Sequence, residues 1–536
     1  MRIRSIEITG FRSIRQLSLD LDESLTILVG ENGTGKSSIS AALTKLFAQC
    51  STNQDQIVIE DDYPFGVVGE LRIEASLQLS TTEQENILGR YLVPSEPFET
   101  RYVHLEWLKQ QASHITLLLR RPGFNDAVLQ LRDVELTRNQ IFRGTATGST
   151  GGPPWFGGPA AAMLRGEEAD GPFQLGAEVP RLLAENRYKV FTEFRGPVSR
   201  TSRTGGMESF AGSETASVLL NLKNHPDESE RRHYGLVKDA FSVFFPQLEI
   251  EAVEQQPGTG MPDIQFKYQS EPIPLKLNHV SSGVHQILTM VTNLVAREGL
   301  IIFIEHPETH LHPQAIRTLN SLIVDASDRN QVIIATHNPE LIDPKRPQSL
   351  RRLWLTSARE TQVSRITGQE EKSLRQMETA LRLGGNREAV FARSVLLVED
   401  QTQQQFLRAV APTLGRDIDA QGVSIITAVD GEDGFKPFFT LLKGLQIPYV
   451  CLKDKPWGDD LMYPARRFFS LGMEIEDFLD QAGLREMRQL VVKEVGKSKP
   501  RVGGELGARL SADQIPEIFD RVLEAAIHVS ADGPES

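Results

Sequence analysis

The stretch Gly30-Glu31-Asn32-Gly33-Thr34-Gly35-Lys36-Ser37 constrains the fold more than any other part of the sequence. It matches the pattern G-x-x-x-x-G-K-[ST], in which glycines let backbone N–H groups turn inward around phosphate oxygens. The apolar run 25–29 predicts a buried strand before it, and residues 38–47 predict a helix after it. A glycine-rich turn that matches by chance would lack this strand and helix, so the sequence predicts a nucleotide-binding α/β domain.

Each part of this loop has an expected task. Lys36 should reach the β- and γ-phosphates of ATP, and the Ser37 hydroxyl should hold Mg²⁺. The N-terminus of the following helix adds a favourable potential for the anion. The loop residues that we expect to bind the nucleotide are Gly30, Asn32, Gly33, Gly35, Lys36, Ser37 and Ser38.

Length and composition narrow the class of protein. A chain of 536 residues, 40% hydrophobic and 24% charged, predicts a globular protein with more than one domain. No apolar run reaches the roughly 18 residues of a membrane helix, and the start lacks a signal-peptide core. We therefore expect no membrane partner. Only two cysteines, Cys50 and Cys451, indicate a reducing, cytoplasmic setting.

The net charge of −13 does not decide whether nucleic acid is bound, because phosphate backbones are recognised by local Lys/Arg patches. Clusters of basic residues occur around Arg120, around Arg231 and from Lys493 to Arg501. Each of them is more often a solvated face than a track for DNA.

Between the loop and residue 275 the pattern changes several times. Residues 57–136 are rich in predicted strands, with a helix expected over 81–92, and residues 144–176 are crowded with glycine and proline. Residues 208–245 have helical periodicity with a break at Pro226. We interpret 205–250 as a helical insertion, for which a dimer contact and an ordinary packed layer are equally good explanations.

Residues 275–340 return to nucleotide chemistry. Ser281-Ser282-Gly283 opens a helix whose N–H groups and hydroxyls could bind phosphate, although this is also a common helix entry. The buried run 300–304 ends in Glu305, which could be a second acidic ligand of Mg²⁺ or simply the end of a strand. The run 331–335 precedes His337, placed where a γ-phosphate sensor is needed, although a single histidine after a strand is usually structural.

These motifs together resemble an ABC-type ATPase of the SMC and RecF kind. In the resemblance Gly30–Ser37 is Walker A, Ser281–Gly283 is the signature, Glu305 is the Walker B acid and His337 is the switch histidine. Phe11–Ile14 in the opening strand region and Leu311–Pro313 as the D-loop region complete the match. Such ATPases hold two nucleotides between two heads, so the resemblance implies a homodimer.

One position departs from this family. The residue after the Walker B acid is normally a glutamate that orients the attacking water, and here it is His306. A neutral histidine could act as the base, and Glu308 could compensate. Alternatively, hydrolysis is slow and ATP serves mainly as a ligand. We expect weak ATPase activity.

After a charged helical connector over 366–390, a second α/β unit begins. The strand 394–398 ends in Glu399, 423–429 forms another strand, and the strand 448–453 ends in Asp454. Acids at the carboxyl ends of neighbouring parallel strands meet at one edge of the sheet, where oxygen ligands can hold Mg²⁺ or Mn²⁺. The alternative is that each acid caps the next helix. Further candidate carboxylates are Asp459, Asp460, Glu474, Glu476 and Asp477.

This second half resembles a Toprim domain, and the order ATPase then Toprim resembles the OLD nuclease family, which includes the Gabija defence nuclease. Glu399 and Asp454 match Toprim acids, 472–477 resembles the late acidic motif, and Lys499-Pro500 resembles the late Lys-Pro motif. Three positions depart. Gln403 stands where a second acid is common, Pro456 replaces the second Asp of Asp-x-Asp, and Asp400 replaces a glycine. Fewer carboxylates leave less charge for two divalent ions.

The sequence thus predicts an α/β protein: an ABC-type ATPase head over 1–365 with an inserted helical segment, then a Toprim domain with a parallel sheet over 391–536. The resemblance implies an ATP-binding, metal-dependent DNA endonuclease in anti-phage defence, working as a homodimer or higher homo-oligomer, with nuclease activity gated by nucleotide. The implied residues are Glu399, Asp454, Glu474, Glu476 and Asp477 for Mg²⁺ or Mn²⁺, Lys499 at the scissile phosphate, and His306 for ATP hydrolysis.

The alternative is an ATP-sensing scaffold whose degenerate Toprim domain binds nucleic acid or a partner defence protein. A RecF-like repair ATPase is a third interpretation, which leaves the acid-tipped second half unexplained.

Overall fold

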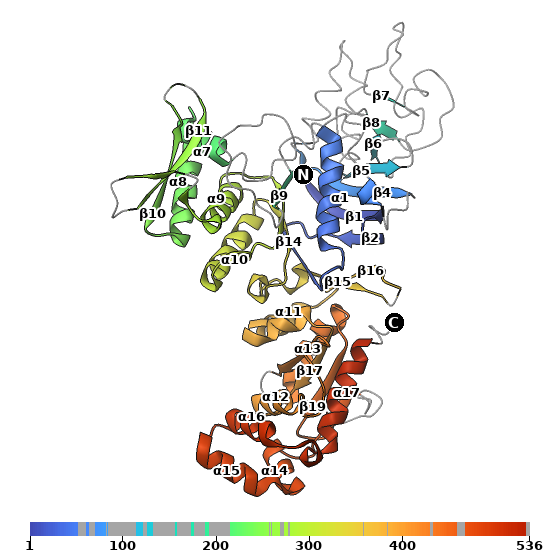
Figure 1. Cartoon of the computed structure of the whole chain (residues 1–536). Helices are drawn as coiled ribbons and strands as arrows, with labels where there is room; N and C mark the ends of the chain where they lie inside the picture. Colours follow the sequence, from blue (N-terminus) through green and yellow to red (C-terminus); the bar gives the residue numbers. More distant parts are fainter. Residues whose placement is uncertain are drawn as a thin grey trace, which may run out of the picture. The chain divides into compact units, whose positions relative to one another are not determined.

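A computed structural model gives the fold of the chain, which divides into two compact units, residues 1–28 with 32–336 and residues 29–31 with 337–536 (Figure 1). Outside the described residues lie Asp459, Asp460, most of the helix expected over 81–92 and most of the glycine- and proline-rich residues 144–176. The structure describes residues 1–51, 60–63, 70–81, 83, 114–121, 126–131, 156–157, 173–175, 188–191, 215–256, 258, 260–268, 273–276, 279–356, 358–382, 384–428, 432–457 and 467–531.

An antiparallel sheet carries the N-terminus. Alternating buried and exposed positions along β1 and β2 place one face of these strands in the core. The strand order is β2-β1-β4-β5-β6-β8-β7. The bounds are β1 (Arg2–Phe11), β2 (Ile14–Asp20), β4 (Leu71–Gln78), β5 (His114–Arg121), β6 (Asp126–Leu131), β7 (Phe156–Gly157) and β8 (Phe173–Leu175).

A second sheet positions the phosphate-binding loop. Every residue of β3, β13 and β14 is buried, as expected for central parallel strands that read as continuous apolar runs. The order is β16-β15-β3-β14-β13-β9, and β3, β14, β13 and β9 run parallel. The bounds are β3 (Leu25–Gly30), β9 (Tyr188–Phe191), β13 (Ile301–Glu305), β14 (Gln331–Ala335), β15 (Leu350–Leu355) and β16 (Thr361–Arg365).

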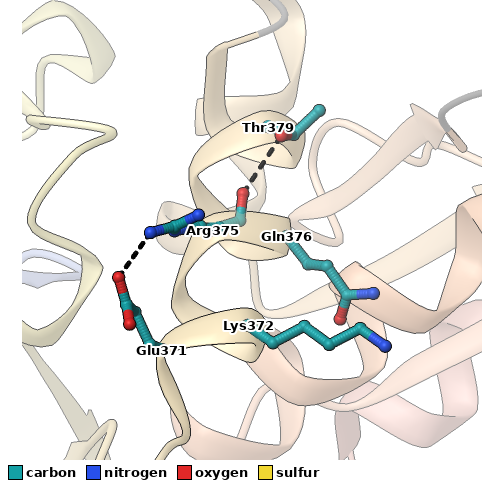
Figure 2. Close-up of a pocket in the computed structure, with 5 residues that line it drawn as sticks. All are labelled: Glu371, Lys372, Arg375, Gln376 and Thr379. Atoms are coloured by element: carbon teal, nitrogen blue, oxygen red, sulfur yellow. Dashed lines mark hydrogen bonds and ion pairs between the residues drawn. The ribbon is translucent and has the colours of Figure 1, made fainter.

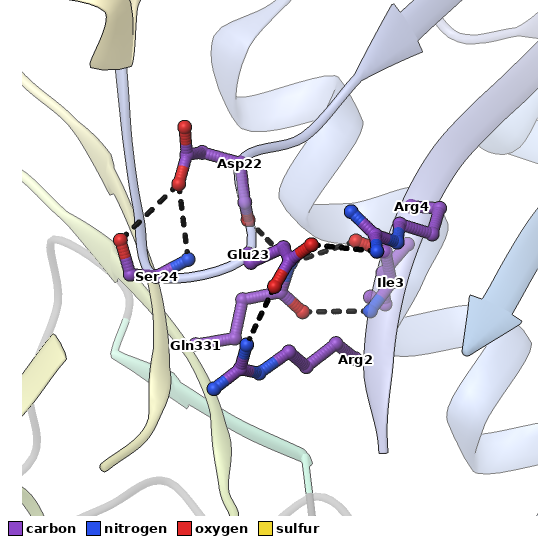
Figure 3. Close-up of polar contacts among 7 residues, drawn as sticks. All are labelled: Arg2, Ile3, Arg4, Asp22, Glu23, Ser24 and Gln331. Atoms are coloured by element: carbon purple, nitrogen blue, oxygen red, sulfur yellow. Dashed lines mark hydrogen bonds and ion pairs between the residues drawn. The ribbon is translucent and has the colours of Figure 1, made fainter. Parts of the chain in front are cut away.

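One side chain joins these two sheets. The Gln331 amide, 1% exposed, accepts from the Ile3 N–H at 2.7 Å and donates to the Ile3 carbonyl at 2.7 Å and to the Asp22 carbonyl at 2.8 Å. Figure 3 shows these contacts beside Glu23, which pairs with Arg2 and Arg4. A strand of each sheet is thereby tied to the other through a single buried amide.

Two helices are present within the predicted insertion, whose bounds of 205–250 stay a prediction. Its helices α7 and α8 are separated at Pro226 as expected, and the Asp227 side chain caps α8 by accepting from the Ser229 N–H at 2.9 Å. A three-stranded antiparallel sheet, β10-β11-β12, follows and was not predicted. The bounds are α1 (Lys36–Ser51), α7 (Thr215–Asn224), α8 (Glu228–Phe244), α9 (Ser282–Val295), α10 (Pro313–Ser327), β10 (Leu248–Glu254), β11 (Pro262–Tyr268) and β12 (Leu275–Lys276).

The second half contains a parallel sheet in the order β18-β17-β19-β20, with β17 and β19 wholly buried at its centre. The sequence predicted three of these strands and missed the short β20. The bounds are α11 (Glu371–Arg382), β17 (Ser394–Val398), α12 (Gln401–Val410), β18 (Val423–Thr427), α13 (Lys436–Gly444), β19 (Tyr449–Lys453), β20 (Phe468–Ser470), α14 (Ile475–Leu479), α15 (Arg485–Val495), α16 (Lys499–Arg509) and α17 (Glu517–Ala531).

Glycines bring α16 unusually close to α12, beside which it lies in Figure 1. A Cβ atom on Gly503 would lie 2.9 Å from the Thr402 Cγ2 and 3.0 Å from the Thr402 carbonyl oxygen. A Cβ atom on Gly507 would lie 2.9 Å from the Ala409 Cβ. This contact fixes the start of α16, where Lys499 stands, relative to the start of α12, which follows Glu399 and Asp400.

Candidate nucleotide site and acidic strand ends

The predicted phosphate loop has the backbone that its sequence implies. Gly30, Gly33 and Gly35 have φ angles of 141°, 81° and 100°, which side-chain-bearing residues rarely adopt. The Ile39 N–H donates to the Gly35 carbonyl at 3.0 Å, so α1 starts directly from the loop. Lys36 is buried, whereas Asn32, Gly33 and Ser37 are exposed. Ser38, also predicted to bind nucleotide, is buried and shares a hydrogen bond of 2.9 Å with the Ser13 hydroxyl.

Glu305 ends β13 at the edge where the loop begins. It is 7% exposed and pairs in register with Ala335 of β14, which in turn pairs with Leu28 of β3. His337 follows β14 by two residues and is half-buried. Because parallel strands end at the same edge of a sheet, Glu305 stands at the edge from which the phosphate loop leaves β3.

Tyr188 of β9 is a neighbour that the sequence did not reveal. Burial raises its pKa well above the ordinary value, and the charge of Glu305 raises it further. Its hydroxyl donates to the Ser40 carbonyl of α1 at 3.4 Å, and its ring stacks on Phe47 with the ring centroids 4.7 Å apart. Tyr188 thus holds α1 against the sheet beside Glu305.

His306 has a left-handed backbone, with φ 45°. Its N–H donates to the Ala335 carbonyl at 2.8 Å, and its Nδ1 lies 3.5 Å from Glu308 Oε1. The structure therefore directs Glu308 at His306, the relation that would let a carboxylate assist a histidine base.

The predicted signature opens α9 as a helix entry. Ser281 is its N-cap but makes no side-chain capping bond, and both Ser281 and Ser282 are exposed. A Cβ atom on Gly283 would lie 3.3 Å from the carbonyl oxygen of His310, so this position packs against the predicted D-loop region. The helix start thus presents hydroxyl groups to the outside of the head.

In the parallel sheet β18-β17-β19-β20, Glu399 and Asp454 lie together as predicted. Glu399 follows β17 and Asp454 follows β19, and the Asp454 N–H donates to Glu399 Oε2 at 2.8 Å. Asp400 instead caps α12 by accepting from the Gln403 N–H at 2.8 Å, which is the alternative task we gave to acids at strand ends.

Gln403 also belongs to this edge, although the sequence showed it only as a departure from the Toprim pattern. It is 0% exposed, and its Nε2 donates to Asp454 Oδ1 at 2.7 Å. Its Oε1 accepts from the Glu399 N–H at 3.0 Å.

The late acids are arranged differently from one another. Lys499 Nζ lies 3.1 Å from Glu474 Oε2 and 3.2 Å from Glu476 Oε1, whereas Asp477 is exposed on the first turn of α14. Among the residues that the structure describes, no three His, Cys, Asp or Glu side chains form a group that could hold a metal ion. The full ligand set therefore stays a prediction.

The chemistry of this edge nevertheless suits a divalent cation. The pKa of Asp454 is raised from 3.8 to about 7, first by burial and then by the negative charges of Glu399, Asp400 and Glu474, against the lowering effect of the Gln403 hydrogen bond. Several carboxylates thus repel one another at one sheet edge, and a cation with oxygen ligands would relieve that repulsion.

A second contact missed from the sequence involves the phosphate loop itself. Arg393, directly before β17, binds Glu31 through Nε at 2.5 Å and Nη2 at 3.0 Å, and both residues belong to the second unit. The buried Arg352 of β15 donates to the carbonyl of Ala392 at 3.2 Å. Glu31 raises the pKa of both guanidinium groups, although burial outweighs this effect at Arg352 and lowers its pKa to about 10.

A surface hollow occurs on α11. Its lining residues all come from this one helix, and Figure 2 shows Arg375 reaching back to Glu371 in an i,i+4 ion pair. It includes none of the predicted site residues, and we assign it no chemistry. The lining is Glu371, Lys372, Arg375, Gln376 and Thr379.

No helix in the described part of the chain combines the length and the apolar character needed to cross a membrane.

Three family models match separate stretches of the chain. Residues 1–103 match an AAA ATPase domain, residues 212–343 match an AAA domain (AbiEii toxin, Type IV TA system), and residues 390–455 match the Toprim domain of proteins like the overcoming lysogenization defect (OLD) protein. With the fold, these matches define the class: an AAA-type ATPase domain followed by a Toprim domain.

Two nucleases and one ATPase head are similar to this chain. The chain is 25% identical over 241 residues to the OLD nuclease of Thermus scotoductus, covering 42% of this chain and 44% of that protein. It is 21% identical over 479 residues to the Old nuclease of Escherichia phage P2, covering 85% of this chain and 77% of that protein. An SMC head bound to the C-winged helix domain of ScpA aligns with a TM-score of 0.42 and 12% identity, over 68% of this chain and 97% of that one. The family models and the two nucleases thus show that this chain is similar to OLD-family proteins and resembles an ATPase domain followed by a Toprim domain.

Proposed function

We propose that the chain is an ATP-binding, divalent-cation-dependent DNA endonuclease that cuts at the acidic edge of the sheet β18-β17-β19-β20. The observation that carries this proposal is the pairing of Glu399 with Asp454 at the ends of two neighbouring parallel strands. The similarity to OLD nucleases with an ATPase and a Toprim domain supports it.

In this proposal Glu399, Asp454 and one or more of Glu474, Glu476 and Asp477 hold Mg²⁺ or Mn²⁺. A divalent cation bound there supplies an activated water and stabilises negative charge on the phosphate. The carboxylates orient the cation, and Lys499 would leave its present acidic partners to neutralise the scissile phosphate.

DNA would approach past the segment that joins α15 and α16. Four exposed basic residues lie in this segment, the end of α15 and the start of α16, and one of them, Lys499, reaches the late acids directly. Phosphate contacts from such a patch make binding strong at low salt and weak at high salt. The basic residues of this patch are Lys493, Lys497, Lys499 and Arg501.

ATP with Mg²⁺ would bind the loop at Lys36 and Ser37, with Glu305 and His337 beside it. The exposed Ser281 and Ser282 at the start of α9 support a homodimer in which the signature of one head contacts the nucleotide of the other. Because His306 stands in place of the usual glutamate, we propose that ATP hydrolysis is weak. We also propose that the protein is cytoplasmic and acts in anti-phage defence.

Nicking of supercoiled plasmid in Mn²⁺ tests the assignment of the acidic edge. Glu399→Gln should lower the rate at least about 100-fold, since loss of a cation ligand costs several kcal/mol. Glu517→Gln, which changes an exposed acid of α17, should cut like wild type. Equal cutting by Glu399→Gln and wild type would show that the edge is not the cleavage site.

Absence of any cutting by the wild-type chain would instead favour the scaffold alternative. One observation favours the scaffold. Lys499 already pairs with two acids and Gln403 with Asp454, so the predicted catalytic groups already have partners within the protein.

We also propose that nucleotide gates cleavage through the contact between Glu31 and Arg393. This ion pair joins the second residue of the phosphate loop to the residue that precedes β17, the strand that ends at Glu399. Because the pair is half-exposed, its contribution to stability is small, about 0–1 kcal/mol, so it can open at little cost.

Arg393→Gln tests this link. We expect ATP to alter plasmid nicking by the wild type and to lose that effect in Arg393→Gln, while binding of a fluorescent ATP analogue persists. Arg375→Gln removes a similar ion pair on α11 and should behave like wild type. An unchanged ATP effect in Arg393→Gln would rule out this route.

A further inference from the structure

The side chain of Gln403 lies between the two acids that are central to the proposed cleavage site. It reaches from the first turn of α12 across the ends of β17 and β19. Both of its polar atoms have protein partners, Asp454 Oδ1 and the Glu399 N–H, at 2.7 and 3.0 Å. At 0% exposure no water competes for these bonds, so the amide is a fixed part of the edge.

The orientation of this amide follows from its partners. The backbone N–H of Glu399 can only donate, so the carbonyl oxygen of the Gln403 side chain must face it. The NH₂ group is then left for Asp454, whose Oδ1 accepts from it at 2.7 Å. A flipped amide would set donor against donor and acceptor against acceptor.

A glutamate of the same length would reverse the chemistry. Its second oxygen would stand where the NH₂ group now is, 2.7 Å from Asp454 Oδ1. Two carboxylate oxygens at that distance cannot both remain charged unless a proton or a cation lies between them. The Gln403 amide supplies the partial positive charge that a cation would otherwise supply there, and an NH₂ group cannot itself ligate a metal ion.

We propose that Gln403 fixes the cation content of this edge: its amide replaces a second divalent cation beside Asp454, and the site holds one. Gln403 is a positioning residue in this account, because it acts through Asp454 and Glu399. The inference rests on the cation site of the proposed function and specifies its stoichiometry.

Counting bound Mn²⁺ on the full chain without nucleotide tests the inference, by equilibrium dialysis or by the electron paramagnetic resonance signal of free Mn²⁺. Wild type should bind one more Mn²⁺ than Asp454→Asn. Gln403→Glu should bind one more than wild type and show the signal of two coupled Mn²⁺ ions. Gln405→Glu adds the same charge to an exposed position of the same helix and should keep the wild-type count.

Each outcome is informative. A folded Gln403→Glu with the wild-type count, or a loss of two ions in Asp454→Asn, would overturn the single-cation inference while leaving the nuclease proposal intact. No difference between wild type and Asp454→Asn would remove the cation site itself, and with it both proposals.

If Gln403→Glu folds only when Mn²⁺ is present, seen as an Mn²⁺-dependent thermal transition absent from Gln405→Glu, the inference is supported. If it folds under neither condition, the comparison of wild type with Asp454→Asn decides alone.

Discussion

The phosphate loop and the acidic edge both stand where buried parallel strands end, but they are made from different parts of the chain. The loop is a backbone site: three glycines with positive φ and a helix start, all within eight consecutive residues. The acidic edge is a side-chain site, assembled from segments around Glu399, Asp454 and Glu474.

The two sites therefore depend on different properties of the protein. A backbone loop keeps its shape whether or not phosphate is bound, because its geometry is fixed locally. The acidic edge depends on charge balance, and in this structure Gln403 and Lys499 provide part of that balance. We therefore expect the loop to tolerate changes in its surroundings and the edge to respond to pH, cations and packing.

The largest expected effect is the loss of ATP binding when the Lys36 side chain is removed from the loop. Lys36→Ala should weaken ATP binding roughly 100-fold, because hydrogen bonds to charged groups contribute about 1.5–3 kcal/mol each. Titration with a fluorescent ATP analogue measures this. Lys372→Ala, at an exposed position of α11, is the control and should bind normally. Unchanged binding by Lys36→Ala would show that the loop does not hold the nucleotide phosphates.

The next effect tests the packing beneath the acidic edge. Gly503→Ala should destabilise the second unit by about 1–3 kcal/mol, because its methyl group would meet the Thr402 carbonyl oxygen at 3.0 Å. The adjacent Gly504→Ala has only ordinary contacts of 3.5 Å or more and should be neutral or slightly stabilising. Urea unfolding of the two variants gives the comparison, and equal midpoints would mean that α16 can move away from α12 at no cost.

A smaller effect follows from the charge crowding at Asp454. The native state holds a proton on Asp454 up to about pH 7, whereas the unfolded chain releases it near 3.8, so stability should fall as pH rises between these values. In EDTA, Asp454→Asn should remove this part of the decline. Thermal unfolding from pH 4 to 8 measures it, with Asp477→Asn as the matched control. The same decline in Asp454→Asn and wild type would contradict the prediction.

The smallest effect is expected at His306. If ATP acts mainly as a ligand, His306→Asn should leave both ATP binding and the slow turnover nearly unchanged, since asparagine accepts the left-handed backbone at φ 45°. A phosphate-release assay measures the turnover. Fast hydrolysis by wild type that disappears in His306→Asn would show that the pair with Glu308 forms a working base.

The sequence predicted the local backbone site better than the site assembled from distant side chains. Gly30–Ser37, Glu305 and the strands around them were predictable, because apolar runs and a local motif carry their own geometry. Glu399 and Asp454 were predictable as strand-end acids of a parallel sheet. The tasks of Gln403, Arg393 and Tyr188 were not, because each depends on a partner 50 or more residues away. The sheet β10-β11-β12 was missed since its strands directly follow a strongly helical segment.

The buried amide of Gln331 has a consequence for how the head unfolds. Its side chain completes hydrogen bonds of β1 in one sheet while its backbone belongs to β14 in the other. Opening either sheet alone would leave buried polar groups without partners, at a cost of about 1–3 kcal/mol for each group. The two sheets should therefore exchange their amide hydrogens with deuterium as one cooperative unit, and Gln331→Leu should separate them into two.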